Sequence, residues 1–345
     1  MTENIEDARA LISSFKQGII QTPKLCDEIV KRARKYLKSP DRYKEYLNFS
    51  ARFHQYSFNN TMLIRMQNPY ASYVGSFKHL KELGYSVKRG EHGYIILVPV
   101  KVTLFERNGK TIRLKDATPN EKYRIAKKGI PVKELTYFKP GTVFDISQTT
   151  ITEKELPKFL GRMAPKADSG DRYEQLRKLV EQHGIPVIEE DLHSVTLSGK
   201  YQLTDDTIHL NSQMGAQNKY ITLIHEFAHA IMHKNAKGNP ELTHESIEFE
   251  AESVAYIVQR QTGADVSDYN FGYITGYFSK MDDTAVAKSL GRIDRAAGYI
   301  TSHLEAAEPE ALPEHPQQEP QREIKQPNTH LVLHDISKKP MEENV

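Results

Sequence analysis

The spacing of apolar residues divides the first half of the chain into a helical part and a strand-rich part. Through residue 70 the pattern predicts helices separated by prolines. The four predicted helices are Glu6–Gly18, Lys24–Leu37, Asp41–His54 and Ser57–Gln67. Near Val87 the period of the apolar positions changes to two, which is typical of half-buried strands. The predicted strands are Tyr94–Val100, Thr111–Leu114 and Thr142–Ile146, with a hairpin turn at Asn108-Gly109.

The second half of the chain mixes short strands with longer helices. The predicted strands are Val187–Glu190, Lys200–Leu203 and Thr207–Leu210. The predicted helices are Arg172–His183, Tyr220–His233, the stretch from His244 to a stop at Gly263, Tyr269–Lys280 and Thr284–Leu304. Strands followed by paired helices predict an α+β fold. We expect Thr207–Leu210 to form an exposed sheet edge, to which a substrate peptide could add as a further strand.

Composition suggests two modest domains and a polar tail. The chain has 345 residues, of which 38% are hydrophobic. We place an N-terminal α+β domain at residues 1–150, a linker containing proline and glycine at 151–170, and a second domain at 171–304. Residues 305–345 contain six of the 17 prolines, with nine acidic and four basic residues, which predicts a disordered tail.

Cysteine content and hydropathy limit the compartment in which the protein works. The single cysteine rules out an internal disulfide framework and fits a reducing compartment, so we expect a cytoplasmic protein. No apolar run approaches the length of a membrane-spanning helix, so we expect no membrane partner.

The candidate chemistry of the second domain lies in Tyr220–His233, which reads YITLIHEFAHAIMH. It contains an H-E-x-x-H motif, in which His225 and His229 share one helix face and can bind one ion. Glu226 lies one residue further round the helix, where its carboxylate can take a proton from water at the metal. The helix is apolar nearly all round, so it should be buried and its polar groups need partners. The alternative is a core helix whose histidines bond to the backbone.

The third ligand must be a histidine, aspartate or glutamate, because the one cysteine is far away in sequence. We favour Glu248, which borders the apolar stripe of the next predicted helix, over the weaker candidates His244 and Glu245. Glu252, one turn further on, is then expected to accept a hydrogen bond that orients one of the zinc histidines. Glu250 is expected to project into solvent. The alternative is an ordinary acidic helix face.

His233 follows the motif but cannot bind the same ion as His225. Eight residues of helix separate the two by about 12 Å along the axis. We expect His233 to act as a cation at the helix end or as a group that supports a ligand histidine. Zinc is the expected ion, although two histidines and one carboxylate also accept manganese or cobalt.

A basic stretch with interleaved aromatic residues lies between Ser76 and Lys139. It contains 15 lysines and arginines against six acidic residues, a net charge of +9, and seven aromatic residues. Basic groups that follow a phosphate backbone, together with rings on which bases can stack, favour single-stranded DNA binding. A solvated basic face over an aromatic core explains the composition equally well.

Two longer segments resemble the N-terminal domain of the ArdC-type antirestriction proteins. They are Tyr56–Val100, YSFNNTMLIRMQNPYASYVGSFKHLKELGYSVKRGEHGYIILVPV, and Phe138–Thr149, FKPGTVFDISQT. Those proteins couple a single-stranded-DNA-binding domain to a C-terminal zincin-type metallopeptidase domain, and the H-E-x-x-H motif falls where that arrangement implies. The segments ITLIHEFAHAIMH and EFEAESVA also resemble the ImmA/IrrE peptidases, whose downstream glutamate corresponds by position to Glu248.

The resemblance implies a protein of a mobile element or phage that protects incoming DNA from host restriction during transfer. It would bind single-stranded DNA and cleave an unidentified protein. Charge and position suggest six residues for DNA contact: Tyr56, Asn60, Lys78, Lys88, Arg89 and Lys101. Two alternatives remain open: a regulatory peptidase that cleaves a repressor, and a DNA-binding protein whose zinc only stabilises the fold.

Overall fold

The computed structural model describes residues 5–306 apart from residues 38, 163–168, 195–196, 235, 237–238, 240–241, 265, 267–270 and 272–280. Apart from Phe271, the helix predicted at Tyr269–Lys280 lies outside the described residues, and so does the predicted tail from residue 307 onward.

Four helices open the chain, close to their predicted positions. They are α1 (Ile5–Lys16), α2 (Thr22–Tyr36), α3 (Pro40–Arg52) and α4 (Phe58–Gln67). At the start of α3, the Ser39 side chain accepts a hydrogen bond from the Arg42 N–H, and Pro40 takes the first helical position. Both features favour a helix beginning there, because the first N–H groups of a helix have no partner within it.

A four-stranded antiparallel sheet follows the helices, with the order β1-β4-β2-β3. Its strands are β1 (Val74–Gly75), β2 (Tyr94–Arg107), β3 (Lys110–Arg113) and β4 (Val132–Asp145). Strands β2 and β4 pair continuously from Tyr94–Val143 to Phe105–Val132 and are longer than the sequence pattern predicts. The predicted turn at Asn108-Gly109 is confirmed, since both residues have positive φ, 52° and 72°.

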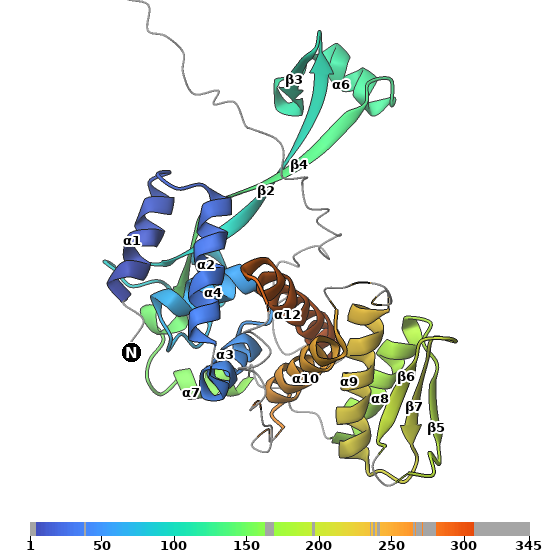
Figure 1. Cartoon of the computed structure of the whole chain (residues 1–345). Coiled ribbons are helices and arrows are strands. Elements are labelled where there is room, and N and C mark those ends of the chain that lie inside the picture. Colours follow the sequence, from blue (N-terminus) through green and yellow to red (C-terminus); the bar gives the residue numbers. More distant parts are fainter. Residues whose placement is uncertain are drawn as a thin grey trace, which may run out of the picture. The chain divides into compact units, whose positions relative to one another are not determined.

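The outer part of the β2–β4 hairpin extends away from the helices, together with β3 and α6 (Figure 1). Helix α6 (Pro119–Ala126) begins with a capping box between Thr118 and Glu121. At the inner part of the sheet lie α5 (Phe77–Glu82) and the short 3-10 helix Ile146–Gln148, and a second 3-10 helix, Leu114–Asp116, follows β3.

Part of the stretch expected to be a linker is a packed helix, α7 (Leu156–Arg162). Its Phe159 is 2% exposed. The Phe159 ring meets the rings of Tyr73 and Tyr85 edge-on, with centroids 5.1 and 5.5 Å away. Such contacts fix α7 against the inner end of the N-terminal sheet.

The second half contains a three-stranded sheet with the order β5-β7-β6. Its strands are β5 (Val187–Glu190), β6 (Gly199–Gln202) and β7 (Thr207–Asn211), all close to prediction. Strand β7 pairs in parallel with β5 and antiparallel with β6, so both of its edges are occupied. The expectation that Thr207–Leu210 is an exposed edge is therefore wrong, and β6 takes that position.

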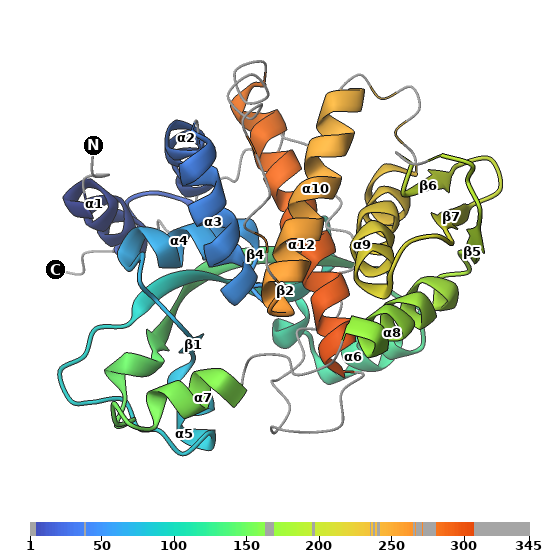
Figure 2. The same cartoon turned by 90° about the horizontal axis from the view of Figure 1, so that it is seen from below.

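Four helices pack together in this half, and α8 and α9 contact the sheet. They are α8 (Ser169–Gln182), α9 (Ala216–His233), α10 (His244–Gln261) and α12 (Asp283–Ala306). Helix α9 lies between the sheet and α10, and α12 packs against α10 and also contacts α9 and α8 (Figure 2). The predicted stop of α10 is confirmed, because Gly263 follows it with φ of 76°. No helix among the described residues is long and apolar enough to cross a membrane.

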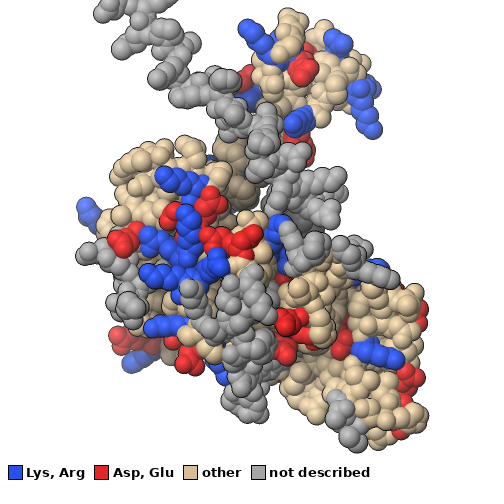
Figure 3. Space-filling view, in the orientation of Figure 1, with Lys and Arg blue, Asp and Glu red and all other residues tan. Residues whose placement is uncertain are grey.

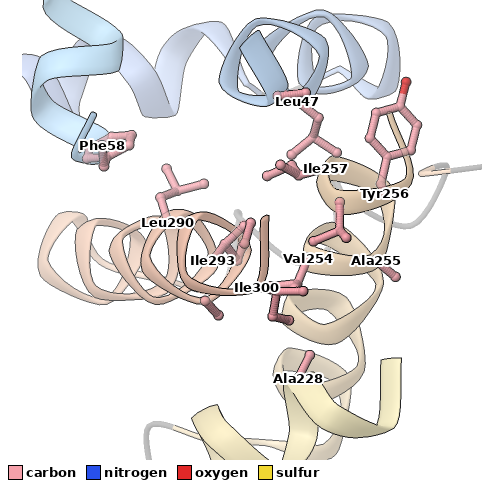
Figure 4. Packing of buried hydrophobic residues seen from close by; sticks show 14 of the residues in the cluster. Leu47, Phe58, Ala228, Val254, Ala255, Tyr256, Ile257, Leu290, Ile293 and Ile300 are labelled. Carbon is pink, nitrogen blue, oxygen red and sulfur yellow. The ribbon is translucent and has the colours of Figure 1, made fainter. Parts of the chain in front are cut away.

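One hydrophobic cluster joins the first helices of the chain to the last ones. Figure 4 shows side chains of α3 and α4 facing side chains of α10 and α12. The residues labelled there are Leu47, Phe58, Ala228, Val254, Ala255, Tyr256, Ile257, Leu290, Ile293 and Ile300. Helices α9 and α10 are thus held from one side by the small sheet and from the other by α3 and α12.

Candidate metal centre

Helix α9 carries the H-E-x-x-H motif in a fully packed environment. Leu223, Ile224, Phe227 and Ala228 are all 0% exposed. The prediction of a buried helix is therefore confirmed. Its neighbour α10 begins after Thr243, whose side chain accepts a hydrogen bond from the Ser246 N–H. This cap fixes the first turns of α10, which face the motif.

The side chains of His225, His229 and Glu248 converge on one point. The two Nε2 atoms lie 3.0 Å apart. The carboxylate oxygens of Glu248 lie 3.4 Å from His225 Nε2 and 3.5 Å from His229 Nε2. Within the described parts of the chain, these are the three residues whose ligand atoms gather as a metal requires, all within 4.8 Å of one another.

These separations fit a divalent metal. Ligand atoms held about 2.1 Å from a tetrahedral ion lie about 3.4 Å from one another, close to the distances found here. Two imidazoles and one carboxylate are also a donor set that zinc, manganese and cobalt accept. His244, the weaker candidate, is 88% exposed, and its Nδ1 lies 3.9 Å from Glu248.

The carboxylate of Glu248 is strongly favoured in its charged form. Hydrogen bonds to His225 and His229 hold its pKa far below the ordinary value, despite partial burial. For His225, burial lowers the pKa, but the hydrogen bond to Glu248 and the charges of Glu226, Glu248 and Glu252 outweigh it and raise the pKa. Cations are therefore favoured at this point of the structure.

Glu226 lies beside the three converging side chains and is 8% exposed. Its Oε2 accepts a hydrogen bond of 2.6 Å from the Tyr201 N–H of β6. Burial raises the pKa of Glu226, and this outweighs the opposite effects of His225, His229 and the Tyr201 N–H. Because the Tyr201 N–H points to Glu226, the free edge of β6 faces the site.

The two residues predicted to support the ligand histidines, His233 and Glu252, differ in their surroundings. His233 is 6% exposed, and its Nδ1 lies 3.3 Å from Nδ1 of His229. Glu252 is half-buried one turn beyond Glu248 and acts on His225 through its charge.

The expectation of a solvated Glu250 is wrong. Its side chain is 0% exposed, bonded to His233 and to Arg292. Helix α12 covers this face of α10, which the sequence of α10 alone does not reveal.

Two of the six residues suggested for DNA contact have their polar atoms engaged within the fold. The Tyr56 hydroxyl donates to the Val74 carbonyl at 3.3 Å, and burial raises the pKa of Tyr56 to about 12. The Asn60 side chain bonds both the N–H and the carbonyl of Leu97 in β2, at 2.7 and 3.0 Å. Both side chains therefore tie α4 and its flank to the sheet.

The four cationic candidates lie at the surface around the sheet. The Lys78 side chain is 88% exposed and 3.6 Å from Glu82, and Lys88 donates to the Ser147 carbonyl at 3.3 Å. Arg89 and Lys101 are exposed. The structure does not bring these four together with Tyr56 and Asn60 in one polar cluster.

The outer hairpin carries most of the net charge of the basic stretch predicted between Ser76 and Lys139, but only one of the six residues suggested for DNA contact, Lys101, lies in it. Residues 101–139 contain eleven lysines and arginines against four acidic residues, a net charge of +7 in a chain whose total is +2. Lys and Arg side chains appear at its outer end in Figure 3. Four exposed large apolar side chains lie here as well: Tyr123, Val132, Leu135 and Tyr137. A charge count over shorter segments is the signal that could have narrowed the basic stretch to this hairpin.

Comparison with known families agrees with this organisation. A model of the N-terminal domain of anti-restriction factor ArdC matches residues 21–144, and a model of the IrrE N-terminal-like domain, Peptidase_M78, matches residues 180–259. Together the two matches support an ArdC-type protein. The chain joins a region that matches the ArdC N-terminal domain to a region that matches a metallopeptidase-type family, and the H-E-x-x-H helix lies inside the second match.

A similar curated protein is an uncharacterized protein of Bacillus anthracis, 29% identical over 304 residues. The match covers 83% of this chain and 51% of that protein, so the chain spans about half the length of this relative. Crystal structures of antirestriction ArdC from the R388 plasmid are also similar, in metal-free and Mn(II)-bound forms. They are 18% and 17% identical, with TM-scores of 0.43 and 0.40, covering 73% of this chain and 86% of that one.

Proposed function

We propose that this chain is an antirestriction protein of a mobile element or phage, which binds single-stranded DNA and carries a metal-dependent peptidase site. The observation that carries the peptidase part is the convergence of His225, His229 and Glu248 beside Glu226. The match of the surrounding residues to a metallopeptidase-type family supports it.

His225, His229 and Glu248 hold the metal, and zinc is the ion we propose. Three protein ligands leave a position open, as in catalytic sites, whereas structural zinc sites are closed by four. Glu248 is 42% exposed, so the centre is accessible to solvent and substrate. When bound, the metal supplies a Lewis acid that polarises the peptide carbonyl.

Glu226 moves the proton in this reaction. It accepts a proton from water as the water oxygen bonds to the carbonyl carbon, and it then donates that proton to the leaving amide nitrogen as the C–N bond breaks. The Tyr201 N–H holds Glu226 Oε2 in place for this transfer. The substrate peptide lies along the free edge of β6, which the same hydrogen bond places at the site.

The N-terminal half binds single-stranded DNA in this proposal. The outer β2–β4 hairpin offers a net charge of +7 for the phosphates and the exposed rings of Tyr123 and Tyr137 for base stacking. The match of residues 21–144 to the ArdC N-terminal domain supports this part.

The test of the peptidase part is the variant Glu226→Gln. It removes the proton acceptor but no metal ligand, so we expect the metal to stay bound while peptide hydrolysis falls about 10²–10⁴-fold. Protection of transferred DNA and bound metal are measured on the same preparations. Glu174→Gln, at an exposed glutamate of α8, is the matched control and should leave peptide hydrolysis, DNA protection and bound metal unchanged.

The two alternatives give different outcomes. If Glu226→Gln keeps the metal, full DNA protection and wild-type cleavage of every peptide or protein that the wild type cleaves, the metal only stabilises the fold and the peptidase proposal is wrong. If the variant loses cleavage of a purified repressor but DNA protection persists, a regulatory peptidase is supported instead.

A further inference from the structure

The ring of His229 continues into a buried polar chain on the side away from the metal ligands. His229 Nδ1 lies 3.3 Å from His233 Nδ1. His233 Nε2 lies 3.1 Å from Glu250 Oε2. The guanidinium of Arg292 then donates to both carboxylate oxygens of Glu250, at 2.8 and 2.5 Å. The chain therefore runs from α9 through α10 to α12.

The protons of this chain can be assigned from its two ends. A ligand histidine offers a lone pair to the metal, so His229 Nε2 is bare and its proton lies on Nδ1. That N–H points at His233 Nδ1, which accepts it, and the proton of His233 then lies on Nε2. The His233 Nε2–H donates to the Glu250 carboxylate, whose charge Arg292 balances. The hydrogen bond to His233 thus fixes the tautomer of His229, and the hydrogen bond to Glu250 fixes the tautomer of His233.

We propose that His233, Glu250 and Arg292 are positioning residues that hold His229 in the tautomer and orientation that binds the metal. The inference rests on the metal centre proposed above and extends it to residues that no ligand motif includes. Partners of this kind raise the basicity of a ligand histidine and fix its ring. Here a second histidine lies between the ligand and the carboxylate.

The burial of the chain supports a role beyond packing. Glu250 is 0% and the His233 side chain 4% exposed. A buried ion pair contributes little net stability compared with apolar residues of the same volume, because both charges lose their hydration. Helices α9, α10 and α12 already share apolar contacts, through residues such as Ala228, Val254 and Ile293. A polar chain ending on one ligand histidine is therefore better explained by its effect on that ligand.

The competing account is a structural tie between three helices, and the two differ in what they predict for the metal. If the polar chain only ties the helices together, a substitution in it lowers the melting temperature of the metal-free protein and leaves the metal dissociation constant unchanged. A positioning role changes that constant and the coordination geometry, whatever happens to the melting temperature.

The experiment uses His233→Phe in the full chain, which keeps a ring but removes both nitrogens. The dissociation constants of Zn²⁺ and Co²⁺ are measured by chelator competition, together with the Co²⁺ absorption spectrum and the melting temperature of the metal-free protein. We expect weakening of metal binding by about 10–100-fold and a changed Co²⁺ spectrum.

The matched control is His54→Phe, at another buried histidine that meets α12. Its Nε2 lies 3.2 Å from Glu305, with the side chain 6% exposed, but it has no part in the metal centre. We expect the metal dissociation constant of this variant to stay within about twofold of the wild type.

If His233→Phe yields no folded protein, Glu250→Gln decides the question, because it keeps the shape but not the charge of the carboxylate. It should weaken metal binding about 10-fold. Wild-type affinity in either folded variant overturns the positioning role. Failure of the wild-type chain to bind metal at all instead overturns the proposed metal centre, so the two failures are distinguishable.

Discussion

At the scale of single residues, a buried carboxylate with a strongly raised pKa lies outside the proposed metal centre. Asp294 of α12 is 7% exposed and accepts hydrogen bonds of 3.0 and 3.2 Å from the Tyr46 hydroxyl of α3. Burial raises the pKa of Asp294 to about 7, and the hydrogen bonds from Tyr46 and Ser50 and the charge of Arg295 offset only part of this. The folded protein therefore holds a proton here that the unfolded chain releases near pH 4.

The sign of the resulting pH dependence follows from the proton count. Between about pH 4 and pH 7 the folded state binds more protons at this residue than the unfolded state, so its contribution to stability falls as the pH rises. Asp294→Asn keeps an acceptor for Tyr46 and removes the charge. We expect the difference in unfolding free energy between this variant and the wild type to shift in favour of the variant between pH 5 and pH 8, by on the order of 1–4 kcal/mol.

The measurement is urea unfolding of both proteins at the two pH values. Asp283→Asn is the control, because its carboxylate pairs with Arg34 at the surface, 2.9 Å away. Because this ion pair is exposed, we expect the unfolding free energy of Asp283→Asn to differ from that of the wild type by less than about 1 kcal/mol at either pH. A difference between Asp294→Asn and the wild type that does not change with pH would contradict the buried-carboxylate account.

At the scale of elements, α12 packs so closely against the end of α3 that the contact leaves no room for a side chain at Gly298. A Cβ at Gly298 would lie 2.5 Å from the His54 carbonyl oxygen, which is backbone and cannot move aside easily. At Gly291 of the same helix, a Cβ would lie 3.2 Å from Arg295 Nη1, the end of a flexible side chain.

These two glycines give a matched pair of variants. Alanine favours a helix by about 0.5–1 kcal/mol over glycine, so Gly291→Ala should be neutral or stabilising. Gly298→Ala gains the same propensity but overfills the contact, at a cost of about 1–3 kcal/mol, and should lower the melting temperature. Equal melting temperatures for the two variants would show that α12 and α3 do not pack as the structure has them.

Elements whose pattern is local were predictable from the sequence. Helix α10 has an apolar stripe and the Gly263 stop, and both were confirmed. The length of β4 was missed because its outer residues are exposed on both faces and show no alternation. The burial of Glu250 was missed because Arg292 comes from α12, 42 residues later, and no local pattern reports such a partner.

The candidate site also has one part that the sequence predicts and one part that it does not. The spacing of His225 and His229 on one helix is a local property, and Glu248 was predicted because it borders the apolar stripe of α10. The contact between β6 and Glu226 depends on strand order, and β7 was mistaken for the edge because the sequence does not say which strands pair.

At the scale of the whole molecule, the two matched regions share buried contacts. Tyr43 and Tyr46 of α3 are 0% exposed and meet Ser253 of α10 and Asp294 of α12, and the ring of Tyr43 lies 5.2 Å from that of Phe249. Removing either region would expose these side chains to water, at about 1.5–3 kcal/mol for each large one. Experiments on DNA binding are therefore designed on the full chain.

The DNA prediction concerns the outer hairpin. Neutralising three exposed cations of α6 and its end should weaken binding to single-stranded DNA and reduce the slope of log affinity against log salt by about 2. The substitutions are Lys122→Gln, Arg124→Gln and Lys127→Gln. Binding is measured by fluorescence anisotropy across a salt series.

The control removes the same number of charges elsewhere, at the exposed Lys154, Lys158 and Lys178. It should leave the affinity and the salt slope near those of the wild type. If both sets reduce binding equally, net charge alone drives the interaction and the hairpin is not the DNA surface.

The most direct test of the account is the metal content of the full chain after equilibration with zinc and dialysis. In the proposed centre three side chains hold the ion and Glu226 does not, so wild type and Glu226→Gln should each retain about one ion per chain, while His229→Ala and Glu248→Ala should lose it. A wild-type chain without metal, or a His229→Ala chain that keeps it, would show that His225, His229 and Glu248 do not form the metal centre.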